Sequence, residues 1–360
     1  MTLWVVKLGT SLLRGDTPGT IAGYAASIAA AMQRGDRCVL VTSGAVGLGC
    51  QRLAMTHRPD SVVALQAAAA IGQGHLMGLY DRALATHGVS VAQVLLTRSD
   101  LVDRRRYHNA SNTLTQLLDW GVLPVVNEND ALSPAELRFG DNDTLSALVA
   151  AAVDADQLIL LTDVEQLYSA DPRIDADALP IPDVLHPRDL AALQSAAGDG
   201  GRWGTGGMTT KLAAARIATA NGITVHLADG RDPSRLDALL SGGRGGTVFH
   251  PSPQPIGNRR SWLAHVLEPQ GELHLDSGAC LALQERGASL LQVGITAVNG
   301  EFAANQPVML IDAQGQEFGR GLCSRDSASL RAALGRSRAL GSSPVVVHRD
   351  AMVLSDRHLS

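Results

Sequence analysis

Residues 3–11 read LWVVKLGTS, and this stretch predicts the fold of the first part of the chain. The apolar run Leu3 to Leu8 is interrupted only by Lys7 and ends at Gly9, a pattern typical of a strand buried on both faces. Similar short runs follow at 38–42, 89–97, 122–126, 157–161 and 223–227, separated by Ala-rich helical stretches. Strands that alternate with helices predict an α/β fold with a mainly parallel sheet sandwiched by helices.

The pattern changes after residue 250. Residues 250–255 read HPSPQP, and this proline-rich stretch predicts a domain boundary. Short β-like runs punctuated by glycines dominate from Gly271 onward, with one expected helix at 327–334. We therefore expect an α/β domain over 1–250, a linker over 251–271 and a small β-barrel-like domain over 272–360.

Composition narrows the classes of function. The chain of 360 residues has a net charge of −5, which argues against a general binder of polyanions. Its four cysteines lack the spacing of a zinc site, and no window of 18 uninterrupted apolar residues suggests a membrane span. We expect a cytoplasmic protein that does not enter a membrane. Residues 271–360 hold 8 arginines against 9 acidic residues, so RNA binding by this part is not expected.

Lysine is rare in this chain. Of its 30 basic residues, only Lys7 and Lys211 are lysines and the other 28 are arginines. Lysine is a compact point charge, whereas arginine is a broad planar fork. Codon bias explains scarcity, but both lysines lie beside glycine-rich segments, where phosphate groups are commonly bound. Lys211 is expected in the first turn of a helix, where a cation opposes the helix dipole, which suggests an anionic partner.

Several known phosphate-binding patterns are absent from the sequence. It contains no GxxxxGK[ST] motif, no protein-kinase motif set, and no GxGxxG after the first strand. Phosphate chemistry must therefore rest on other segments. At the end of the first strand, Lys7 offers a cation and Gly9 offers backbone N–H groups to a phosphate. Ser43-Gly44-Ala45 follows the second strand, where it is either an anion site at a helix N-terminus or a plain helix cap.

Two polar clusters, Asn127 to Asp130 and Gly140 to Asp143, flank a short excursion near the same sheet edge. Carboxylates can hold an ammonium group and amides can donate to a carboxylate, so the pair suits an amino-acid zwitterion. Asn and Asp are also common in ordinary turns, which would explain one such cluster well but explains two at the same edge poorly.

Two further segments are candidates. Thr162-Asp163 ends the most apolar strand. Residues 204–211 (GTGGMTTK) combine glycines with a helix start, as close backbone approach to phosphates requires.

The motifs also occur in a recognisable order. They are VVKLGTSLL (5–13), VTSGAVGLG (41–49), LLTRSDL (95–101), VLPVVNENDA (122–131), FGDNDTLSALVA (139–150), LILLTDVEQLYSADPR (158–173) and GTGGMTTKLAAA (204–215). Together they closely resemble the glutamate 5-kinases, a group within the amino-acid kinase family. GELHLDSGACLAL (271–283) and PVVVHRD (344–350) resemble the PUA domain that many such enzymes carry.

The resemblance implies ATP-dependent phosphorylation of the glutamate γ-carboxylate, which gives γ-glutamyl phosphate, the first intermediate of proline biosynthesis. It implies catalytic roles for Lys7, Lys211 and Asp143, with Asp143 orienting both lysines. The implied glutamate-binding residues are Ser43, Gly44, Ala45, Asn127, Asp130, Asp141 and Asn142. The implied ATP-binding residues are Lys7, Gly9, Thr162, Asp163, Thr205, Gly206, Gly207, Met208, Thr209, Thr210 and Lys211.

The resemblance also implies Mg²⁺ bridging the ATP phosphates, with no protein ligand assigned to the metal. It further implies a homo-oligomer and feedback inhibition by proline.

The residues themselves leave two other functions open. One is another amino-acid kinase acting on aspartate, N-acetylglutamate, carbamate or a nucleoside monophosphate. The other is an RNA-binding protein defined by its C-terminal domain.

Overall fold

The computed structural model describes residues 1–13, 17–97, 100–101, 104–132, 142–172, 175–185, 189, 207–253, 255, 269–304, 306–334 and 343–354. The chain divides into two compact units, Met1–Pro255 and Ile256–Ser360. Of the expected functional residues, Asp141, Thr205 and Gly206 lie outside the described residues.

Unit 1 is built around a sheet that has eight strands within the described residues, in the order β3-β4-β2-β1-β5-β9-β10-β8. The strands are β1 (Leu3–Leu8), β2 (Arg37–Val41), β3 (Val91–Leu96), β4 (Leu123–Glu128), β5 (Gln157–Thr162), β8 (Asp183–Val184), β9 (Thr224–Asp229) and β10 (Thr247–Phe249). Only the β9–β10 pair runs antiparallel, so the predicted mainly parallel sheet is confirmed. A separate hairpin pairs β6 (Leu167–Tyr168) with β7 (Pro180–Ile181).

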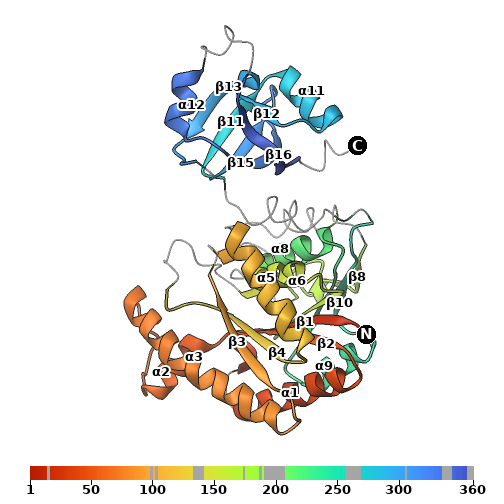
Figure 1. Ribbon diagram of the computed structural model, residues 1–360. Helices are drawn as coiled ribbons and strands as arrows, with labels where there is room; N and C mark the ends of the chain where they lie inside the picture. Colours follow the sequence, from red (N-terminus) through yellow and green to blue (C-terminus); the bar gives the residue numbers. More distant parts are fainter. Residues whose placement is uncertain are drawn as a thin grey trace. The chain divides into compact units, whose positions relative to one another are not determined.

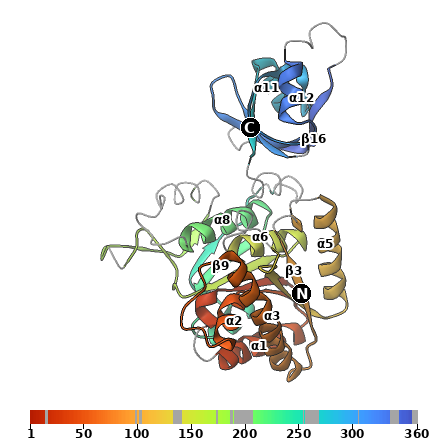
Figure 2. The same ribbon diagram turned by 90° about the vertical axis from the view of Figure 1, so that its left-hand side faces the viewer.

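Helices cover both faces of this sheet (Figures 1 and 2). One face carries α1 (Thr17–Gln33), α3 (Val62–Ala85) and α9 (Ser234–Leu240), and the other carries α5 (Arg104–Asp119), α6 (Asn142–Ala152) and α8 (Gly207–Ala220). Alternate residues of β1, which are Trp4, Val6 and Leu8, are buried against the first of these layers. The central strands are therefore apolar on both faces, as the sequence pattern predicts.

The short helix α2 (Ala45–Arg52) was not predicted as a separate element. It packs directly on α3, and the two backbones touch because glycines lie at the contact. A Cβ at Gly72 would lie 1.8 Å from the carbonyl oxygen of Ala45, and one at Gly49 would lie 1.8 Å from that of Ala68. Glycine disfavours a helix in isolation, so α2 depends on this tertiary contact rather than on local propensity.

By length and composition alone, α3 with its 24 residues is apolar enough to cross a membrane. Its side chains Leu76, Tyr80 and Leu84 are buried in the core of unit 1. Packing against α1, α2 and the sheet therefore accounts for the buried face of α3, whereas Val63 and Ile71 are exposed.

Unit 2 holds a curled sheet of six strands within its described residues, in the order β12-β16-β15-β14-β11-β13 (Figure 1). The elements are β11 (Gly271–Leu275), α11 (Ser277–Arg286), β12 (Leu290–Leu291), β13 (Ile295–Gly300), β14 (Pro307–Ile311), β15 (Glu317–Cys323), α12 (Ser327–Ala333) and β16 (Val345–Leu354). The expected small β-rich domain is confirmed, with its own apolar core.

Helix α11 and strand β15 are among the elements of unit 2 that were missed from the sequence. Helix α11 has a cap at each end, because Asp276 accepts a hydrogen bond from the Ala279 N–H (2.7 Å) and Gly287 follows with a φ of +55°. Strand β15 contains glycines that usually weaken strands. A Cβ at Gly319 would lie 2.4 Å from the Val353 carbonyl oxygen, so glycine permits the close pairing of β15 with β16.

A half-buried histidine, His226, is expected to make the stability of unit 1 depend on pH. The ring nitrogen Nε2 of His226 lies 2.6 Å from Oε1 of Gln157, and the ring lies beside Trp4. Burial, with smaller contributions from the charges of His250 and Arg244, lowers the pKa of His226 to about 4. The unfolded chain therefore takes up a proton at a higher pH than the folded chain does.

We predict that acid destabilises unit 1 through this residue. The stabilisation is fully present above the unfolded pKa of about 6.5 and is lost as the pH falls toward 4. Between pH 7.5 and pH 5.0 the loss from this group should be about 2 kcal/mol. Urea denaturation at both pH values should show a smaller pH dependence for His226→Gln than for the wild type, and equal pH dependence would contradict the assignment.

Candidate active site

The carboxyl ends of the parallel strands bring the predicted residues to one edge of the sheet. Lys7 lies near the end of β1, where it is opposite Val41 of β2 and Leu160 of β5. Ser43 follows β2, Asn127 lies near the end of β4, and Thr162 ends β5. Ligands of open parallel sheets bind at this edge, so the fold itself gathers these side chains.

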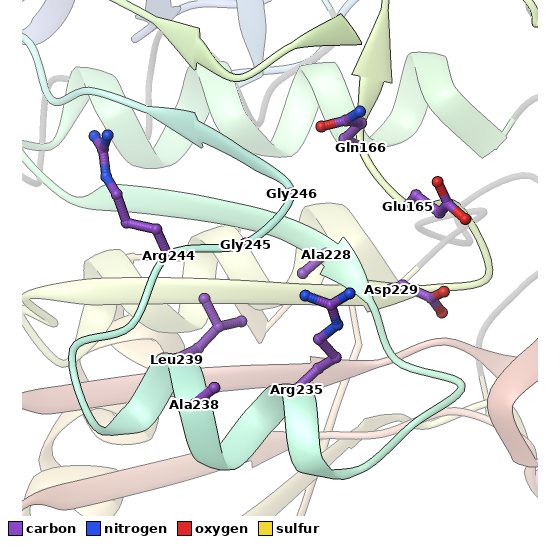
Figure 3. A pocket seen from close by; sticks show the side chains of 10 residues that line it. All are labelled: Glu165, Gln166, Ala228, Asp229, Arg235, Ala238, Leu239, Arg244, Gly245 and Gly246. Atoms are coloured by element: carbon purple, nitrogen blue, oxygen red, sulfur yellow. The ribbon is translucent and has the colours of Figure 1, made fainter.

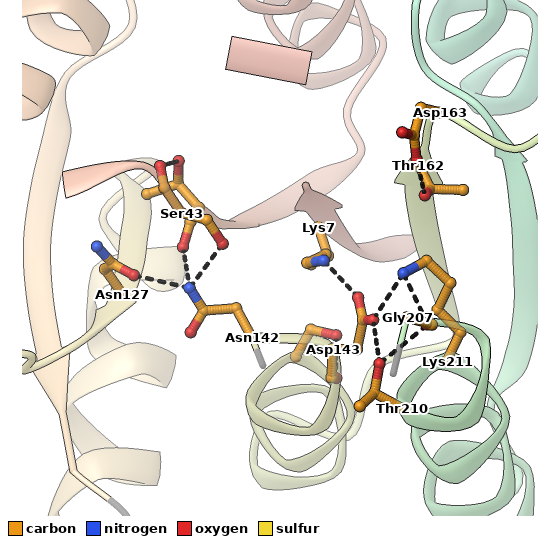
Figure 4. Close-up of polar contacts among 12 residues, drawn as sticks. Lys7, Ser43, Asn127, Asn142, Asp143, Thr162, Asp163, Gly207, Thr210 and Lys211 are labelled. Carbon is orange, nitrogen blue, oxygen red and sulfur yellow. Dashed lines mark hydrogen bonds and ion pairs between the residues drawn. The ribbon is translucent and has the colours of Figure 1, made fainter. Parts of the chain in front are cut away.

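The centre of the site is the carboxylate of Asp143, at the start of α6 (Figure 4). Lys7 forms an ion pair with Oδ1, while the Lys211 ammonium lies 3.0 Å from Oδ2. Thr210 also donates a hydrogen bond to Oδ2, at 3.1 Å. Three elements that are distant in sequence, β1, α6 and α8, therefore meet at a single carboxylate.

All three charged side chains are buried. The exposed fraction is 3% for Lys7, 0% for Asp143 and 8% for Lys211. Burying a charge is costly unless it is paired and hydrogen-bonded. The three side chains together carry a net charge of +1, and they lie at the edge where a ligand would approach. An anion such as a phosphate group would complement this charge.

Lys211 does not lie in the first turn of its helix, as the sequence analysis expected. Helix α8 begins at Gly207, so Lys211 is its fifth residue, and its ammonium donates to the Gly207 carbonyl oxygen (3.1 Å). The pairing with Asp143 offsets the unfavourable dipole at this end of the helix. Met208 is buried and Thr209 is exposed on the same first turn.

A second cluster, made of polar side chains, surrounds Asn142. Its amide nitrogen contacts the Thr42 carbonyl oxygen (2.7 Å), Ser43 Oγ (2.8 Å) and Asn127 Oδ1 (2.9 Å). Asn127 Oδ1 also accepts from the Glu128 N–H (2.9 Å). These contacts tie the ends of β2 and β4 to the first residue of α6.

Asn142 and Asp143 are consecutive in sequence, yet they turn toward different sides of the site (Figure 4). Asn142 contacts the polar cluster at β2 and β4, and Asp143 contacts the two lysines. The first turn of α6 therefore connects a region suited to an amino acid with a region suited to phosphate. The start of α6 also adds the positive end of the helix dipole at the same point.

Gly9 and Thr162 lie beside the lysine side of the site. The Gly9 N–H donates to the Leu161 carbonyl oxygen (3.2 Å), and a Cβ at Gly9 would lie 3.8 Å from Lys7 Nζ. A side chain at residue 9 would therefore extend into the space in front of that ammonium. The Thr162 hydroxyl donates to Asp163 Oδ1 (3.1 Å), so these two residues contact each other rather than Asp143 in the described contacts.

A pocket of about 270 Å³ opens on the polar side of the site. It is lined by Ala45, Ala69, Ala70, Gln73, Gly74, Gln93, Leu95, Glu128, Asn129, Asp130 and Ala131. Of the expected glutamate-binding residues, Ala45 and Asp130 line it directly. Gln73, from α3, was not predicted. The available signal was an amide that follows the Ala-rich run of residues 67–72 in this helix.

Helix α3 also supports the site through Tyr80. Its hydroxyl lies 2.8 Å from Thr42 Oγ1, beside the carbonyl group that Asn142 contacts. Burial raises the pKa of Tyr80 well above its usual value, so this phenol stays neutral.

A pocket of about 320 Å³ lies between α9, the end of β9 and the turn at Gly245 and Gly246 (Figure 3). Its charged groups are largely paired with neighbours. Asp229 is bound by Arg231 at 2.6 Å, which holds the pKa of the carboxyl below its usual range, and Arg244 lies 3.2 Å from Asp183. This pocket lacks the buried lysine side chains of the Asp143 cluster.

No group of three or more His, Cys, Asp or Glu side chains that could hold a metal ion occurs in the part of the chain that the structure describes. The buried lysines and the α6 amide groups are instead suited to an anion. A metal that arrives with a polyphosphate would take its ligands from the phosphate oxygens.

Comparisons with known proteins agree with this geometry. The model of the amino acid kinase family matches residues 2–229, and that of the PUA domain matches residues 271–339. Glutamate 5-kinase of Synechococcus sp. (strain CC9605) is 76% identical over 357 residues, covering 99% of this chain and 100% of the relative. Glutamate 5-kinase of Prochlorococcus marinus (strain MIT 9313) is 68% identical, covering 98% of this chain and 99% of the relative.

Among solved structures, carbamate kinase from Giardia lamblia bound to AMP-PNP matches with a TM-score of 0.51 and 18% identity. The match covers 70% of this chain and 99% of that protein. At this identity the likeness concerns the fold alone. From the family model, the full-length relatives and the shared fold, we conclude that the chain belongs to the amino acid kinase family and carries a C-terminal PUA domain.

Proposed function

We propose that this protein transfers the γ-phosphoryl group of ATP to the γ-carboxylate of glutamate, giving γ-glutamyl phosphate and ADP. The observation that carries the proposal is the pair of buried lysines on Asp143, one residue away from the polar cluster of Asn142. The glutamate 5-kinases that match over their full length support the choice of substrate.

The reaction needs no protein base. A γ-carboxylate is ionised at neutral pH, so its oxygen attacks the γ-phosphorus directly while the bond to the β-bridging oxygen breaks. Catalysis then consists of alignment and charge stabilisation. Lys7 and Lys211 stabilise the transferring phosphoryl group, and one ammonium about 4 Å from a phosphoryl oxygen contributes about 4 kcal/mol at an effective dielectric constant of 20. Asp143 orients both lysines.

Nucleotide and metal are assigned to the lysine side. The residues proposed to bind ATP are Lys7, Gly9, Thr162, Asp163 and Thr205 to Lys211. Gly9 leaves room for a phosphate in front of Lys7, and the start of α8 offers the positive end of a helix dipole. Mg²⁺ would neutralise charge on the ATP phosphates, with phosphate oxygens as its main ligands.

Glutamate is assigned to the polar side. Ser43, Asn127 and Asn142 form the hydrogen-bonded cluster, Gly44 and Ala45 offer backbone N–H groups at the start of α2, and Asp130 offers a carboxylate for the ammonium group. Asp141 precedes this cluster in sequence. We further propose that proline competes at this site, that the protein acts as a homo-oligomer in the cytoplasm, and that unit 1 contains the whole kinase site.

The substrate assignment predicts a selective activity. Glutamate should stimulate ADP release in the presence of Mg²⁺-ATP and should yield an acyl phosphate that hydroxylamine traps. Aspartate, N-acetylglutamate and carbamate should not do so, because the proposed site pairs a free ammonium group with Asp130 and brings a γ-carboxylate to the lysines. A coupled assay with this panel tests the prediction, and equal turnover of glutamate and N-acetylglutamate would refute it.

The two lysines should not be replaceable by arginine. We predict that Lys7→Arg and Lys211→Arg each lower kcat by about a hundredfold or more, because a planar guanidinium does not fit a site shaped for a compact ammonium. The loss should fall mainly on kcat, since the contact strengthens in the transition state. The melting temperature of each variant should be measured as a control. If both variants keep the wild-type kcat, the lysines have no catalytic role.

Asp143 should also stabilise the fold. Asp143→Asn leaves two buried ammonium groups without their shared carboxylate, so we expect a loss of about 3 kcal/mol, or about 6–12 °C in Tm. The matched control is Asp119→Asn, which breaks a surface pair with Arg37 and should cost less than about 1 kcal/mol. Thermal unfolding without nucleotide or phosphate in the buffer compares the two, and equal melting temperatures would contradict the role of Asp143.

A further inference from the structure

Gln73 is the one buried amide of the site that no motif predicts. It lies on α3, and the backbone contact at Gly72 holds this part of α3 against Ala45 of α2. Its side chain is 8% exposed and lines the 270 Å³ pocket together with Asp130. The close packing of α2 on α3 therefore places an amide group from a distant helix at the polar side of the site.

Only one end of this amide is used. Gln73 Oε1 accepts a hydrogen bond from Asn127 Nδ2, at 2.8 Å. The amide nitrogen, Nε2, is buried and has no hydrogen-bond partner among the described residues. A buried donor left unsatisfied costs free energy, so such a group at a pocket wall points to a ligand acceptor.

The position of Gln73 indicates which part of the substrate it meets. Asn127 lies between Gln73 and Asn142, because its Nδ2 contacts Gln73 and its Oδ1 contacts Asn142. The lysines and Asp143 lie on the other side of the first turn of α6 (Figure 4). The γ-carboxylate must face the lysines to react, so the α-carboxylate is the acceptor at the Gln73 end.

We infer that Gln73 binds the α-carboxylate of the amino-acid substrate by donating a hydrogen bond from Nε2. This inference rests on the proposed function and adds a specificity-determining residue to it. The same amide orients Asn127 through Oε1, and Asn127 in turn contacts Asn142. Gln73 thereby selects substrates that carry a free α-carboxylate.

Gln73→Glu separates the two ends of the amide. The new side chain has nearly the same shape and can still accept from Asn127, but it replaces the donor with a second acceptor that repels a carboxylate. We expect KM for glutamate to rise about tenfold or more, the scale of a lost hydrogen bond to a charged group. The kcat at saturating glutamate and KM for ATP should change less than about twofold, because the lysine side is untouched.

The α-amide of glutamate provides the complementary substrate. It keeps the reacting γ-carboxylate but carries an NH₂ group in place of one α-carboxylate oxygen. Wild-type protein should use it with a KM about tenfold or more above that of glutamate. Gln73→Glu should narrow or reverse this preference, because the NH₂ group can donate to the new carboxylate. If Gln73 had only a structural role, the substitution would raise KM for glutamate and for its α-amide by the same factor.

The matched control is Gln116→Glu, the same change on the exposed face of α5, which should leave both KM values unchanged. If Gln73→Glu does not fold, Gln73→Met removes the donor without adding charge, and it should also reduce the preference for glutamate over its α-amide. Wild-type protein that uses both substrates with equal KM would overturn the inference without any variant. Absence of glutamate-dependent ADP release in the wild type would instead overturn the proposed function itself.

Discussion

The ion pairs of Asp143 with Lys7 and Lys211 are the interaction on which the rest of the site depends. Lys7 comes from the central strand β1, Asp143 from α6 and Lys211 from α8, so one carboxylate fixes the relative positions of three elements. A wholly buried carboxylate requires such partners, and two buried ammonium groups require a shared anion. The same ion pairs thus fix the positions of α6 and α8 relative to β1 and set the charge of the site.

Much of this arrangement could be predicted from sequence because strand ends are local signals. Lys7 precedes the glycine that ends its strand, and Ser43 follows an apolar run in the same way, so a parallel sheet brings both to one edge. The rarity of lysine marked Lys7 and Lys211 as special. That both would share Asp143 came only from the resemblance, since no sequence pattern gives the rotation of α6 and α8.

Other features depend on contacts that no local pattern encodes. Gln73 reaches the site only because glycines let α2 and α3 touch, a tertiary condition that the residue itself does not reveal. For helix α2 the sequence indicated only a possible start at Ser43-Gly44-Ala45, because its glycines argue against a helix until the partner is known. Strand β15 was missed because its glycines read as turns, whereas in the structure they admit the neighbouring strand. Helix α11 did carry signals, in Asp276 and Gly287, that a closer search for caps would have found.

The consecutive placement of Asn142 and Asp143 limits how the protein can vary in length. Neighbouring residues on a helix point about 100° apart, so consecutive residues such as Asn142 and Asp143 can contact different partners. One residue inserted between them would swing one contact away from its partners while leaving the other in place. The start of α6 therefore fixes both the distance and the relative orientation between two binding regions. Insertions can accumulate in the surface loops of such a fold, but this junction has no room for them.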